Sequence, residues 1–450
     1  MGMSYTTPVF YGQKAVGQLQ LNRSTGLPQL DYHQLWQQEG FPLSPALFLH
    51  QPHHPASLYN YLDNLLPEGE ARRLLAQNIG VSEKQVYPQI RELGQDLSGA
   101  FVFGDATPQL AKPSFRPISS TEMILRLEQK EDVGLLMWDE KPRLSVAGVQ
   151  DKLNVFVSPD GQIGFGDGSL CSTHLLKFER KNCPHLVLNE FFCMKLAEKV
   201  GLAVAPVQFM RFGHHPALLV KRFDRKYDRG AGRVLRQHVI DGCQALDLPR
   251  DYKYERNLGD GRDVAHIRDG ASLSKLFEFC RQTPTSAENS LWLLNWQLFN
   301  LMISNYDSHA KNLSFHYGKL GSQKVNGVAT QRCQFTQSYD LVNVAMFEQF
   351  KHSLAMAMGD EFEPDSIHAY QLADFAETCG LDKKLVARTL SILSKKVLRE
   401  LDTLDADALT TRDAVLNEAE RDYWQLLRQH VKDRTTHLAA QAQDIPGIVV

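Results

Sequence analysis

The segment that most constrains the fold of this 450-residue chain is an apolar stretch that follows Pro284. Thr285 and Glu288 have the spacing of a helix capping box, and residues 291–303 are apolar on nearly every face of the helix that they predict. A helix that is apolar all round must be buried, so we expect it at the centre of a helical lobe. The stretch is too short and too interrupted by polar residues to span a bilayer. It leads directly into a polar loop at residues 305–312.

Within that loop, Asp307 and Asn312 are separated by the same five positions as the aspartate and asparagine of a protein-kinase catalytic loop. At this spacing, Asp307 can accept a hydrogen bond from an attacking hydroxyl while Asn312 supplies an oxygen to magnesium. Lys311 lies close enough to neutralise charge on a transferred phosphoryl group. Polar loops after buried helices commonly contain Asp, Ser, His and Asn, so this spacing alone is weak evidence for a kinase.

A second carboxylate, Asp340, follows a predicted strand at Phe335–Tyr339. A kinase needs a magnesium-binding aspartate in such a place, although this chain has Tyr-Asp-Leu where many kinases have Asp-Phe-Gly. The competing interpretation is an aspartate that simply ends a strand. Asp340 is therefore a magnesium ligand only if the other parts of a kinase site are also present.

Lys177 lies in a predicted apolar strand, His174–Phe178, where an ammonium group is costly unless it is paired or bound to phosphate. This makes Lys177 a candidate phosphate ligand. Glu190, in a predicted helix at residues 186–200, is its candidate ion-pair partner. The alternative is a lysine on an exposed edge strand with Glu190 in solvent.

Upstream of this strand, residues 145–152 form a loop of mostly small side chains whose backbone N–H groups can approach phosphates closely. It matches neither a Walker A sequence nor G-x-G-x-x-G, and it would be unconvincing alone. The order of the parts is more informative. A loop, a strand lysine, a helix glutamate, a hinge-like strand at 218–223, a buried helix, an Asp/Asn loop and a strand-end aspartate follow one another as in a two-lobed kinase.

The distribution of predicted elements indicates an α+β, two-lobed, protein-kinase-like fold with a strand-rich N-terminal lobe and an all-helical C-terminal lobe. Residues 105–118 contain three prolines and few apolar side chains, which is typical of a connector. We predict an N-terminal subdomain at 1–107, a kinase N-lobe with the phosphate-binding loop at 108–225, and a helical C-lobe with the catalytic loop at 226–450.

Composition limits the class of protein. With 43% hydrophobic and 22% charged residues, the chain has the balance of an ordinary globular protein. Its net charge of -3 argues against strong nonspecific binding of nucleic acid by the whole molecule. The seven cysteines are an odd number without a C-x-x-C pair, which favours neither a disulfide framework nor a zinc site. Because the sequence begins without a signal-peptide pattern, we expect a cytoplasmic protein without a membrane span.

Taken together, the motifs resemble those of the HipA family of toxin kinases. They occur in that family's order and extend over nearly the full chain. The matching segments are Leu65–Gly69, Leu97–Gly104, Ser145–Lys152, His174–Lys177, Asn189–Glu190, Lys221–Arg225, Asp307–Asn312 and Tyr339–Asp340. The resemblance implies a HipA-like fold and an ATP- and Mg²⁺-dependent serine/threonine protein kinase.

Carried over residue by residue, the resemblance implies that Asp307 is the catalytic base and that Asn312 and Asp340 bind magnesium. Ser145 matches a serine that is autophosphorylated in this family, which expels the phosphate-binding loop and silences the kinase. The residues implied to bind the nucleotide are Ala147, Gly148, Val149, Gln150, Asp151, Lys152, Lys177, Lys221, Arg222, Phe223, His309, Lys311, Asn312, Tyr339 and Asp340.

The resemblance also implies partners. Family members work beside a helix-turn-helix antitoxin of the HipB type, and the pair binds operator DNA. Family members phosphorylate aminoacyl-tRNA synthetases, although no motif in this chain identifies its own substrate. We expect variable partner contacts in the connector and at residues 252–270, which are rich in charges and glycines.

Two other functions stay open. A small-molecule kinase of the aminoglycoside or choline type would share the two-lobed plan, but such enzymes usually carry His-Gly-Asp and Ile-Asp-x-Asp segments that this sequence lacks. A nucleotide-binding co-repressor without kinase activity is the second alternative. The intact set of Lys177, Asp307, Asn312 and Asp340 argues against it.

Overall fold

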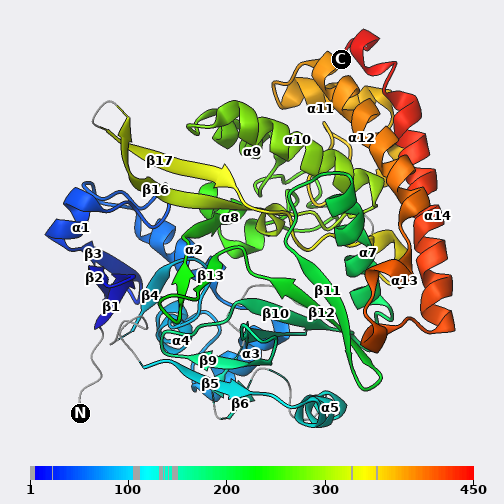
Figure 1. Ribbon diagram of the computed structural model, residues 1–450. Helices are drawn as coiled ribbons and strands as arrows, with labels where there is room; N and C mark the ends of the chain where they lie inside the picture. The colour runs from blue at the N-terminus through cyan, green and yellow to red at the C-terminus, as the bar shows by residue number, and fades with distance from the viewer. Residues whose placement is uncertain are drawn as a thin grey trace.

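The chain folds into an N-terminal unit, a strand-rich lobe and a helix-rich lobe that pack on one another (Figure 1). The computed structural model describes residues 6–22, 24–104, 112–130, 135, 137–139, 141–143, 151–325, 328–350 and 353–450. The first predicted boundary, at residue 107, lies outside this set. The second, between 225 and 226, falls at the start of strand β13 (Arg225–Asp228). Both limits stay predictions.

The N-terminal unit contains an antiparallel sheet with the strand order β3-β2-β1-β4 and helices beside it. Val9, Val16 and Leu19 are almost fully buried and form part of its core, while Ala15 and Gln18 of β2 are exposed. The pairing of β1 with β2 shifts register between Val9 and Phe10, so burial does not follow a strict two-residue period. Its elements are β1 (Thr6–Tyr11), β2 (Lys14–Leu21), β3 (Pro28–Tyr32), α1 (Gln34–Glu39), α2 (Pro55–Leu65), α3 (Gly69–Asn78), α4 (Val86–Leu93) and β4 (Phe101–Phe103).

The strand-rich lobe is built on an antiparallel sheet with the order β11-β12-β10-β8-β9-β5. Its elements are β5 (Ser114–Pro117), α5 (Ser120–Glu128), β6 (Met137–Trp138), β7 (Lys141–Pro142), β8 (Lys152–Val157), β9 (Ile163–Asp167), β10 (His174–Phe178), α7 (Leu186–Lys199), β11 (Val207–Phe212) and β12 (His215–Lys221). The predicted strand at 174–178 and the helix at 186–200 are confirmed. The hinge-like strand ends at Lys221, two residues earlier than predicted.

Strand β10 lies inside this sheet, and its register places Lys177 opposite Lys152 of β8 on one side and Leu218 of β12 on the other. Lys177 is therefore not on an edge strand, which removes the alternative of a solvated lysine. Helix α7 packs against β11 and β12 and also against the C-terminal helices, so Glu190 on this helix is fully buried.

The two-lobed α+β fold is confirmed, but the C-terminal part is not all-helical. It contains the hairpin of β13 and β14 (Arg233–Arg236) and a sheet with the order β15-β16-β17. These strands are β15 (Val239–Asp241), β16 (Ser314–Val325) and β17 (Val328–Phe335). The strand predicted at 335–339 is also corrected, because β17 ends where that segment begins, and beyond it only an isolated bridge joins Ser338 to Val204.

Aromatic packing explains why a hairpin forms here. The rings of Phe315 on β16 and Phe335 on β17 stack with centroids 4.1 Å apart. Trp292 of the adjacent helix stacks on Phe335 at 4.0 Å. The aromatic side chains of the hairpin therefore pack against the helix. Aromatic residues are favoured in strands that pack in this way.

Helix α10 (Ser286–Met302) is the predicted buried helix. Its second half is almost completely enclosed, including Trp296 and Phe299, whereas Leu291 at its start is 48% exposed. The predicted capping box is wrong. The Thr285 side chain makes no cap and instead donates a hydrogen bond to the Cys333 carbonyl oxygen of β17 at 3.2 Å.

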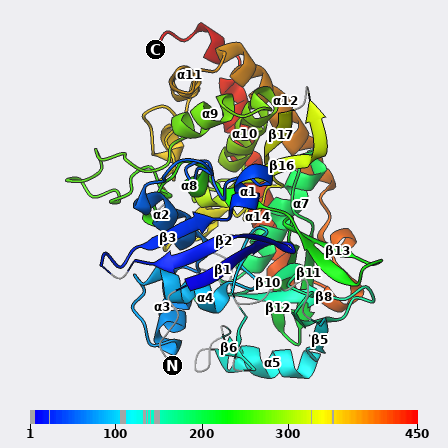
Figure 2. The same cartoon turned by 90° about the vertical axis from the view of Figure 1, so that its left-hand side faces the viewer.

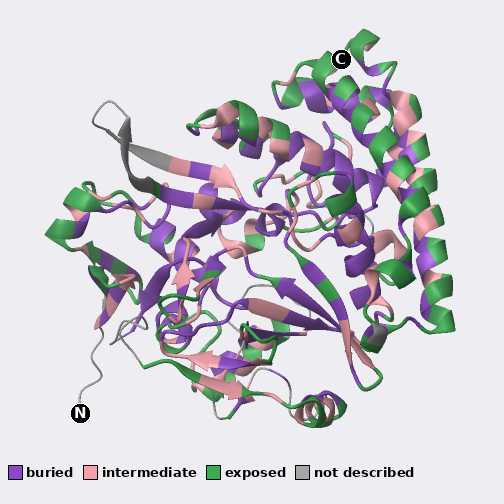
Figure 3. Cartoon of the chain, in the orientation of Figure 1, coloured by how far each residue is buried: buried purple, intermediate pink, exposed green. Residues whose placement is uncertain are grey.

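Helices α9, α12 and α14 pack against α10, and the long α14 presents an exposed face and a buried face along its length (Figure 3). The further elements are α8 (Gly242–Ala245), η2 (Arg250–Tyr252), α9 (Leu273–Arg281), η3 (Ala310–Asn312), η4 (Val344–Met346), η5 (Pro364–Ser366), α11 (Ala369–Thr378), α12 (Lys383–Thr403), α13 (Ala406–Leu409), η6 (Arg412–Ala414), α14 (Glu418–Gln441) and η7 (Ile445–Gly447). No helix in the described ranges has the length and apolar character needed to cross a bilayer.

One hydrophobic core extends through all three parts, and the strand-rich lobe has a second cluster that includes Leu153 and Leu176. A single cluster of buried side chains runs from Val9 of β1 through Phe191 of α7 to Leu438 of α14. The view in Figure 2 shows the N-terminal unit at the level where the strand-rich lobe meets the helices above it. The N-terminal unit therefore lies beside the junction of the two lobes, where a kinase site is expected.

Candidate active site

Two adjoining cavities lie at this junction. The larger has a volume of about 690 Å³ and is lined by residues from all three parts of the chain. The smaller, of about 130 Å³, lies toward β12. The side chains that line both are Leu175, Lys177, Lys311 and Tyr339. Most of the predicted site residues that the structure describes meet at these cavities.

Lys177 lies at the centre of the site and contacts two carboxylates. Its Nζ donates hydrogen bonds to Glu190 Oε1 at 2.7 Å and to Asp340 Oδ1 at 2.6 Å. The predicted ion pair with Glu190 is present, and the strand lysine and the strand-end aspartate are in direct contact. Asp340 itself has a backbone φ of 58°, in the left-handed region that residues with a side chain rarely adopt. Such conformations persist where the surrounding structure imposes them, often at functional sites.

These contacts determine the protonation states of Lys177 and Asp340. Burial by itself lowers the pKa of Lys177, but the carboxylates of Asp340 and Glu190 outweigh it and hold the pKa above its ordinary value. Burial raises the pKa of Asp340, yet the attraction of Lys177 prevails and lowers it to about 2. Lys177 and Asp340 are therefore both charged at neutral pH.

The catalytic-loop candidates line the same cavity as this group. Asp307 is exposed, and its Oδ1 accepts a hydrogen bond from the Tyr254 hydroxyl at 2.7 Å. Its backbone oxygen accepts hydrogen bonds from the His309 N–H at 2.8 Å and from the Asn312 Nδ2 at 2.9 Å. The five-residue spacing thus closes a compact loop in which the amide nitrogen of Asn312 is used internally. Its amide oxygen is the atom that can ligate a cation.

The residues present fit magnesium held together with phosphates. Asp340 and Asn312 offer the hard oxygen donors that Mg²⁺ prefers, and this ion usually completes its shell with water and substrate phosphate oxygens. Among the described residues, no group of three or more His, Cys, Asp or Glu side chains forms a complete metal site made of protein alone. Among the residues that the structure describes, the buried His309 Nδ1 at the cavity wall has no hydrogen-bond partner, which suits a site completed by a ligand.

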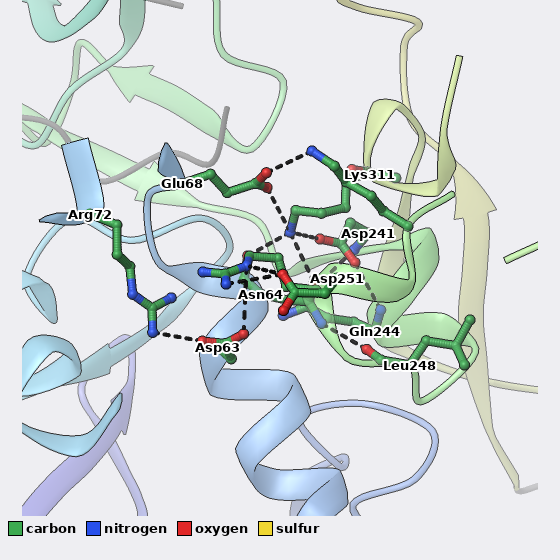
Figure 4. A network of polar contacts seen from close by, with 12 residues as sticks. Asp63, Asn64, Glu68, Arg72, Asp241, Gln244, Leu248, Asp251 and Lys311 are labelled. Carbon is green, nitrogen blue, oxygen red and sulfur yellow. Dashed lines mark hydrogen bonds and ion pairs between the residues drawn. The ribbon is translucent and has the colours of Figure 1, made fainter. Parts of the chain in front are cut away.

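Lys311 lines both cavities, and its ammonium group is bonded to neighbouring residues. Its ammonium donates to the Asn64 carbonyl oxygen at 2.8 Å, to Asn64 Oδ1 at 3.0 Å and to Asp241 Oδ2 at 2.7 Å (Figure 4). An ammonium group has three hydrogens, and these three acceptors occupy them. In this arrangement Lys311 joins the catalytic loop to Asn64 of the N-terminal unit, and its role at a phosphoryl group stays a prediction.

The smaller cavity contains the predicted adenine-side residues. Lys221, Arg222 and Phe223 line it, and the Phe223 ring lies 5.3 Å from that of Tyr339. The Arg222 guanidinium is directed into the protein, where it donates to Asp224 at 2.9–3.0 Å and to the Ser172 hydroxyl at 2.8 Å. The aromatic rings, not the Arg222 charge, are thus the groups suited to a flat base.

The phosphate-loop candidates are only partly described. Ser145, Ala147, Gly148, Val149 and Gln150 lie outside the described residues. Their roles stay predictions.

The end of that loop is described. Asp151 Oδ2 accepts a hydrogen bond from Lys130 at 2.9 Å, so its carboxylate faces a lysine outside the cavity. Lys152 is buried and lines the larger cavity. Burial and the nearby charge of Lys177 lower the pKa of Lys152 to about 7. A buried ammonium of this kind gains stability when an anion enters the cavity.

Comparison with known families gives the same result. The sequence model described as the HipA N-terminal domain matches residues 7–104, and that of the HipA-like C-terminal domain matches residues 144–401. A serine/threonine-protein kinase toxin HipA from Shewanella oneidensis is 41% identical over 395 residues, which is 87% of each chain. The chain belongs to the HipA family. Its enzyme class is that of a serine/threonine protein kinase.

A further relative and a solved structure agree. A putative kinase of Sinorhizobium fredii, Y4mE, is 29% identical over 86% of this chain and 88% of its own. In a solved complex of Shewanella oneidensis HipA with HipB and operator DNA, one chain matches this structure with a TM-score of 0.87 and 36% identity. The match covers 99% of this chain and 100% of that one.

Three residues at this HipA-family site were not identified from the sequence. Tyr254 and Lys253 lie in the segment that we expected to make variable partner contacts, but they line the larger cavity. Glu68 lies in a recognised motif of the N-terminal unit, yet nothing in its sequence context indicates that it faces the catalytic loop. The residues in these contacts are 53 and 185 positions apart in the sequence, so no local sequence pattern can predict them.

Proposed function

We propose that this chain is the kinase toxin of a HipA/HipB-like toxin-antitoxin pair and that it transfers phosphate from ATP, with magnesium, to serine or threonine hydroxyls of a protein. The observation that carries the proposal is the contact of Lys177 with both Glu190 and Asp340, across one cavity from Asp307. A lysine, a helix glutamate and a metal-binding aspartate in contact, facing a catalytic-loop aspartate, form the arrangement that protein kinases use to position phosphates.

In this proposal the adenine occupies the smaller cavity beside Phe223 and Tyr339, and the phosphates extend toward Lys177 and Lys152. Asp340 and Asn312 would hold the magnesium ion, which would offset the negative charge of the phosphates. Lys177 keeps Asp340 in place and contributes positive charge to the phosphates.

Asp307 performs the proton transfer in this proposal. Its carboxylate accepts the proton of a serine or threonine hydroxyl that enters the open side of the larger cavity. The hydroxyl oxygen forms the new bond to the terminal phosphorus while the bond to the bridging oxygen breaks, and ADP leaves. Tyr254 holds Oδ1 of the base, so the second carboxylate oxygen, Oδ2, is directed to the substrate.

Ser145 is the proposed autophosphorylation site, and the reaction occurs between molecules. The serine precedes the buried Lys152 by seven residues in the loop that is proposed to cover the phosphates. A phosphate on Ser145 adds close to two negative charges at this position. Because those charges repel the nucleotide phosphates, the modified loop leaves the site and the kinase becomes inactive.

The proposed partners are a HipB-like helix-turn-helix antitoxin and, through it, operator DNA. The Shewanella relative was solved with both, and it matches this chain over its full length. The net charge of -3 suits a chain that leaves most phosphate contacts to its partner. The proposed substrate is a protein of the translation machinery, such as an aminoacyl-tRNA synthetase.

The decisive experiment is phosphopeptide mass spectrometry after purified protein is incubated with ATP and magnesium. We expect phosphate on Ser145 in the wild type, none in Asp307→Asn, and none at that position in Ser145→Ala. Asp422→Asn, which changes an exposed carboxylate on α14, is the matched control and should behave as wild type.

Wild-type protein that binds ATP but carries phosphate on no serine or threonine would contradict protein-kinase activity. The small-molecule kinase or the co-repressor would then become the better explanation. Phosphate on Ser145 in Asp307→Asn would keep the kinase but remove Asp307 as its base.

A further inference from the structure

The Lys311 ammonium, which sequence analysis assigned to the transfer site, donates its hydrogen bonds to Asn64 and Asp241. Lys177 is likewise held by two carboxylates. Phosphoryl transfer nevertheless needs cationic donors beside the oxygens of the transferred group. Another lysine on the wall of the larger cavity, Lys253, is placed to supply them.

Lys253 lies directly beside the catalytic loop. Its carbonyl oxygen accepts a hydrogen bond from the Ala310 N–H at 3.2 Å, and its neighbour Tyr254 contacts Asp307. The Lys253 ammonium bonds to Glu68 Oε2 at 2.7 Å. Within the described part of the chain, no second acceptor lies within hydrogen-bond distance of this ammonium, so two of its three donors are available to a ligand.

The segment that carries Lys253 is firmly held. The Glu255 N–H donates to the Ala355 carbonyl oxygen at 2.9 Å, and the Ala271 N–H donates to the Tyr252 carbonyl oxygen at 2.8 Å. The Glu255 carboxylate accepts the Ala357 N–H at 2.8 Å and pairs with Arg268. Backbone contacts on both sides leave little freedom to the main chain, which suits a residue that must hold a charge at a fixed point.

Glu68 is the side chain that positions the Lys253 ammonium, and it comes from the N-terminal unit at the start of α3. The carboxylate is buried, contacts Lys253, and lies 4.0 Å from the Lys311 ammonium through its other oxygen (Figure 4). Burial raises its pKa, but Lys311 and Lys253 outweigh this effect and lower it to about 2, so the group is ionised at neutral pH. It also lines the larger cavity.

We propose that Lys253 binds the phosphoryl group that is transferred, and that Glu68 of the N-terminal unit is the positioning residue that holds it there. This inference rests on the proposed kinase function and extends it. Lys253 donates two hydrogen bonds to the terminal phosphate of the bound nucleotide while Asp307 takes the proton of the acceptor hydroxyl. The N-terminal unit thereby completes the kinase site instead of only covering it.

The test compares two nucleotides that differ in the terminal phosphate. Isothermal titration with magnesium and either ADP or the non-hydrolysable analogue AMP-PNP measures binding without turnover. We expect Lys253→Met to bind AMP-PNP at least about tenfold more weakly than wild type, because charge-assisted hydrogen bonds are lost, while its affinity for ADP is unchanged. Lys253→Arg, which keeps the charge, should recover part of the difference.

Two further variants separate the role of the charge from that of the fold. Glu68→Gln should weaken AMP-PNP binding less than Lys253→Met does and should also leave ADP binding unchanged. Lys226→Met, on the exposed side of β13, is the control and should change neither. Thermal unfolding of every variant shows whether it is folded, and Lys253→Arg serves as the test if the methionine variant is not.

The outcomes are distinct. Equal losses of ADP and AMP-PNP affinity in Lys253→Met, or no loss of either, would overturn the role of Lys253. An unchanged AMP-PNP affinity in Glu68→Gln would overturn the role of Glu68. Wild-type protein that binds neither nucleotide would instead remove the proposed kinase function, and this inference with it.

Discussion

At the scale of single residues, the least expected contact is the one between the Tyr254 hydroxyl and Asp307 Oδ1. Burial, and then the charge of Asp307, raise the pKa of Tyr254 well above its ordinary value, so the phenol keeps its proton and acts as a donor. The ring is fixed from another side by an edge contact with His309 at 5.1 Å. Tyr254 therefore determines which way the carboxylate of the proposed base points.

Removing this hydroxyl should slow phosphoryl transfer without weakening nucleotide binding. For Tyr254→Phe we expect the rate of phosphate incorporation from radiolabelled ATP to fall about tenfold, since one hydrogen bond that orients the base is lost. The KM for ATP should stay the same, because the tyrosine faces the acceptor side of the site. Tyr252→Phe, two residues away, is the control. A changed KM with an unchanged rate would show that Tyr254 acts on the nucleotide instead.

The sequence predicted those site residues whose chemistry conflicts with their surroundings. Lys177 is unusual because an ammonium group stands in an apolar strand, and its partner Glu190 lies in the next helix. Asp307 and Asn312 have the five-position spacing of a protein-kinase catalytic loop, which gained weight only from the other motifs around it. Lys311 stands where a kinase site needs a basic residue. The direction of its side chain, however, is set by Asn64 and Asp241, which belong to other elements. Side-chain direction is set by tertiary contacts, so the sequence could not predict it.

At the scale of elements, the turn between β12 and β13 carries a buried ionic cluster. Asp224 accepts hydrogen bonds from Arg222, from Arg225 Nη1 at 2.6 Å, and from the Gly99 N–H of the N-terminal unit at 2.8 Å. Arg225 also donates to the Leu97 carbonyl oxygen at 2.6 Å. Burial raises the pKa of Asp224, but the two arginines outweigh it and hold the pKa far below its ordinary range. This turn therefore joins the N-terminal unit to the strand-rich lobe.

Replacing Asp224 should be severely destabilising. Asp224→Ala leaves two buried guanidinium groups without their shared partner, and we expect the free energy of unfolding to fall by about 3–5 kcal/mol. Urea denaturation followed by circular dichroism measures this loss. The control Asp422→Ala, at an exposed position on α14, should change it by less than about 0.5 kcal/mol. A loss of similar size in both variants would contradict a special role for the cluster.

The elements that the sequence predicted best are those with a continuous apolar pattern, such as β10 and the second half of α10. The β16–β17 hairpin was missed as an element. Residues 318–331 are rich in Gly, Lys and Gln and show no clear two-residue alternation. The hairpin is stabilised by the stack of Phe335 on Trp292, a contact between elements that no window of sequence contains.

At the scale of the whole molecule, His238 lies at the interface between the N-terminal unit and the rest of the chain. The residue is buried, its Nε2 lies 2.8 Å from the Leu43 carbonyl oxygen, and its ring packs edge-on against Phe101 at 4.5 Å. Burial lowers the pKa of His238 to about 4. The folded state therefore contains a neutral imidazole down to acidic pH, whereas the unfolded chain takes up a proton near pH 6.5.

This difference predicts a loss of stability in acid. Between pH 6.5 and pH 4 the unfolded state binds the proton and the folded state does not, so the free energy of unfolding falls as the pH falls. For His238 alone, the loss between pH 7 and pH 5 is about 2 kcal/mol. Urea unfolding at the two pH values measures it. His238→Gln, which keeps a donor but does not titrate, should show a smaller loss, and an equal loss would contradict the assignment.

The bond between Lys311 and Asn64 also bears on when the protein becomes active during its synthesis. The two residues are 247 positions apart, so Asn64 leaves the ribosome long before its partner exists. Contacts this distant along the chain form late, because a long loop must close before they stabilise anything. A growing chain that has not yet reached Asp340 also lacks one of the two partners of Lys177. If Asp340 holds magnesium as proposed, a chain that ends before this residue is expected to be catalytically inert.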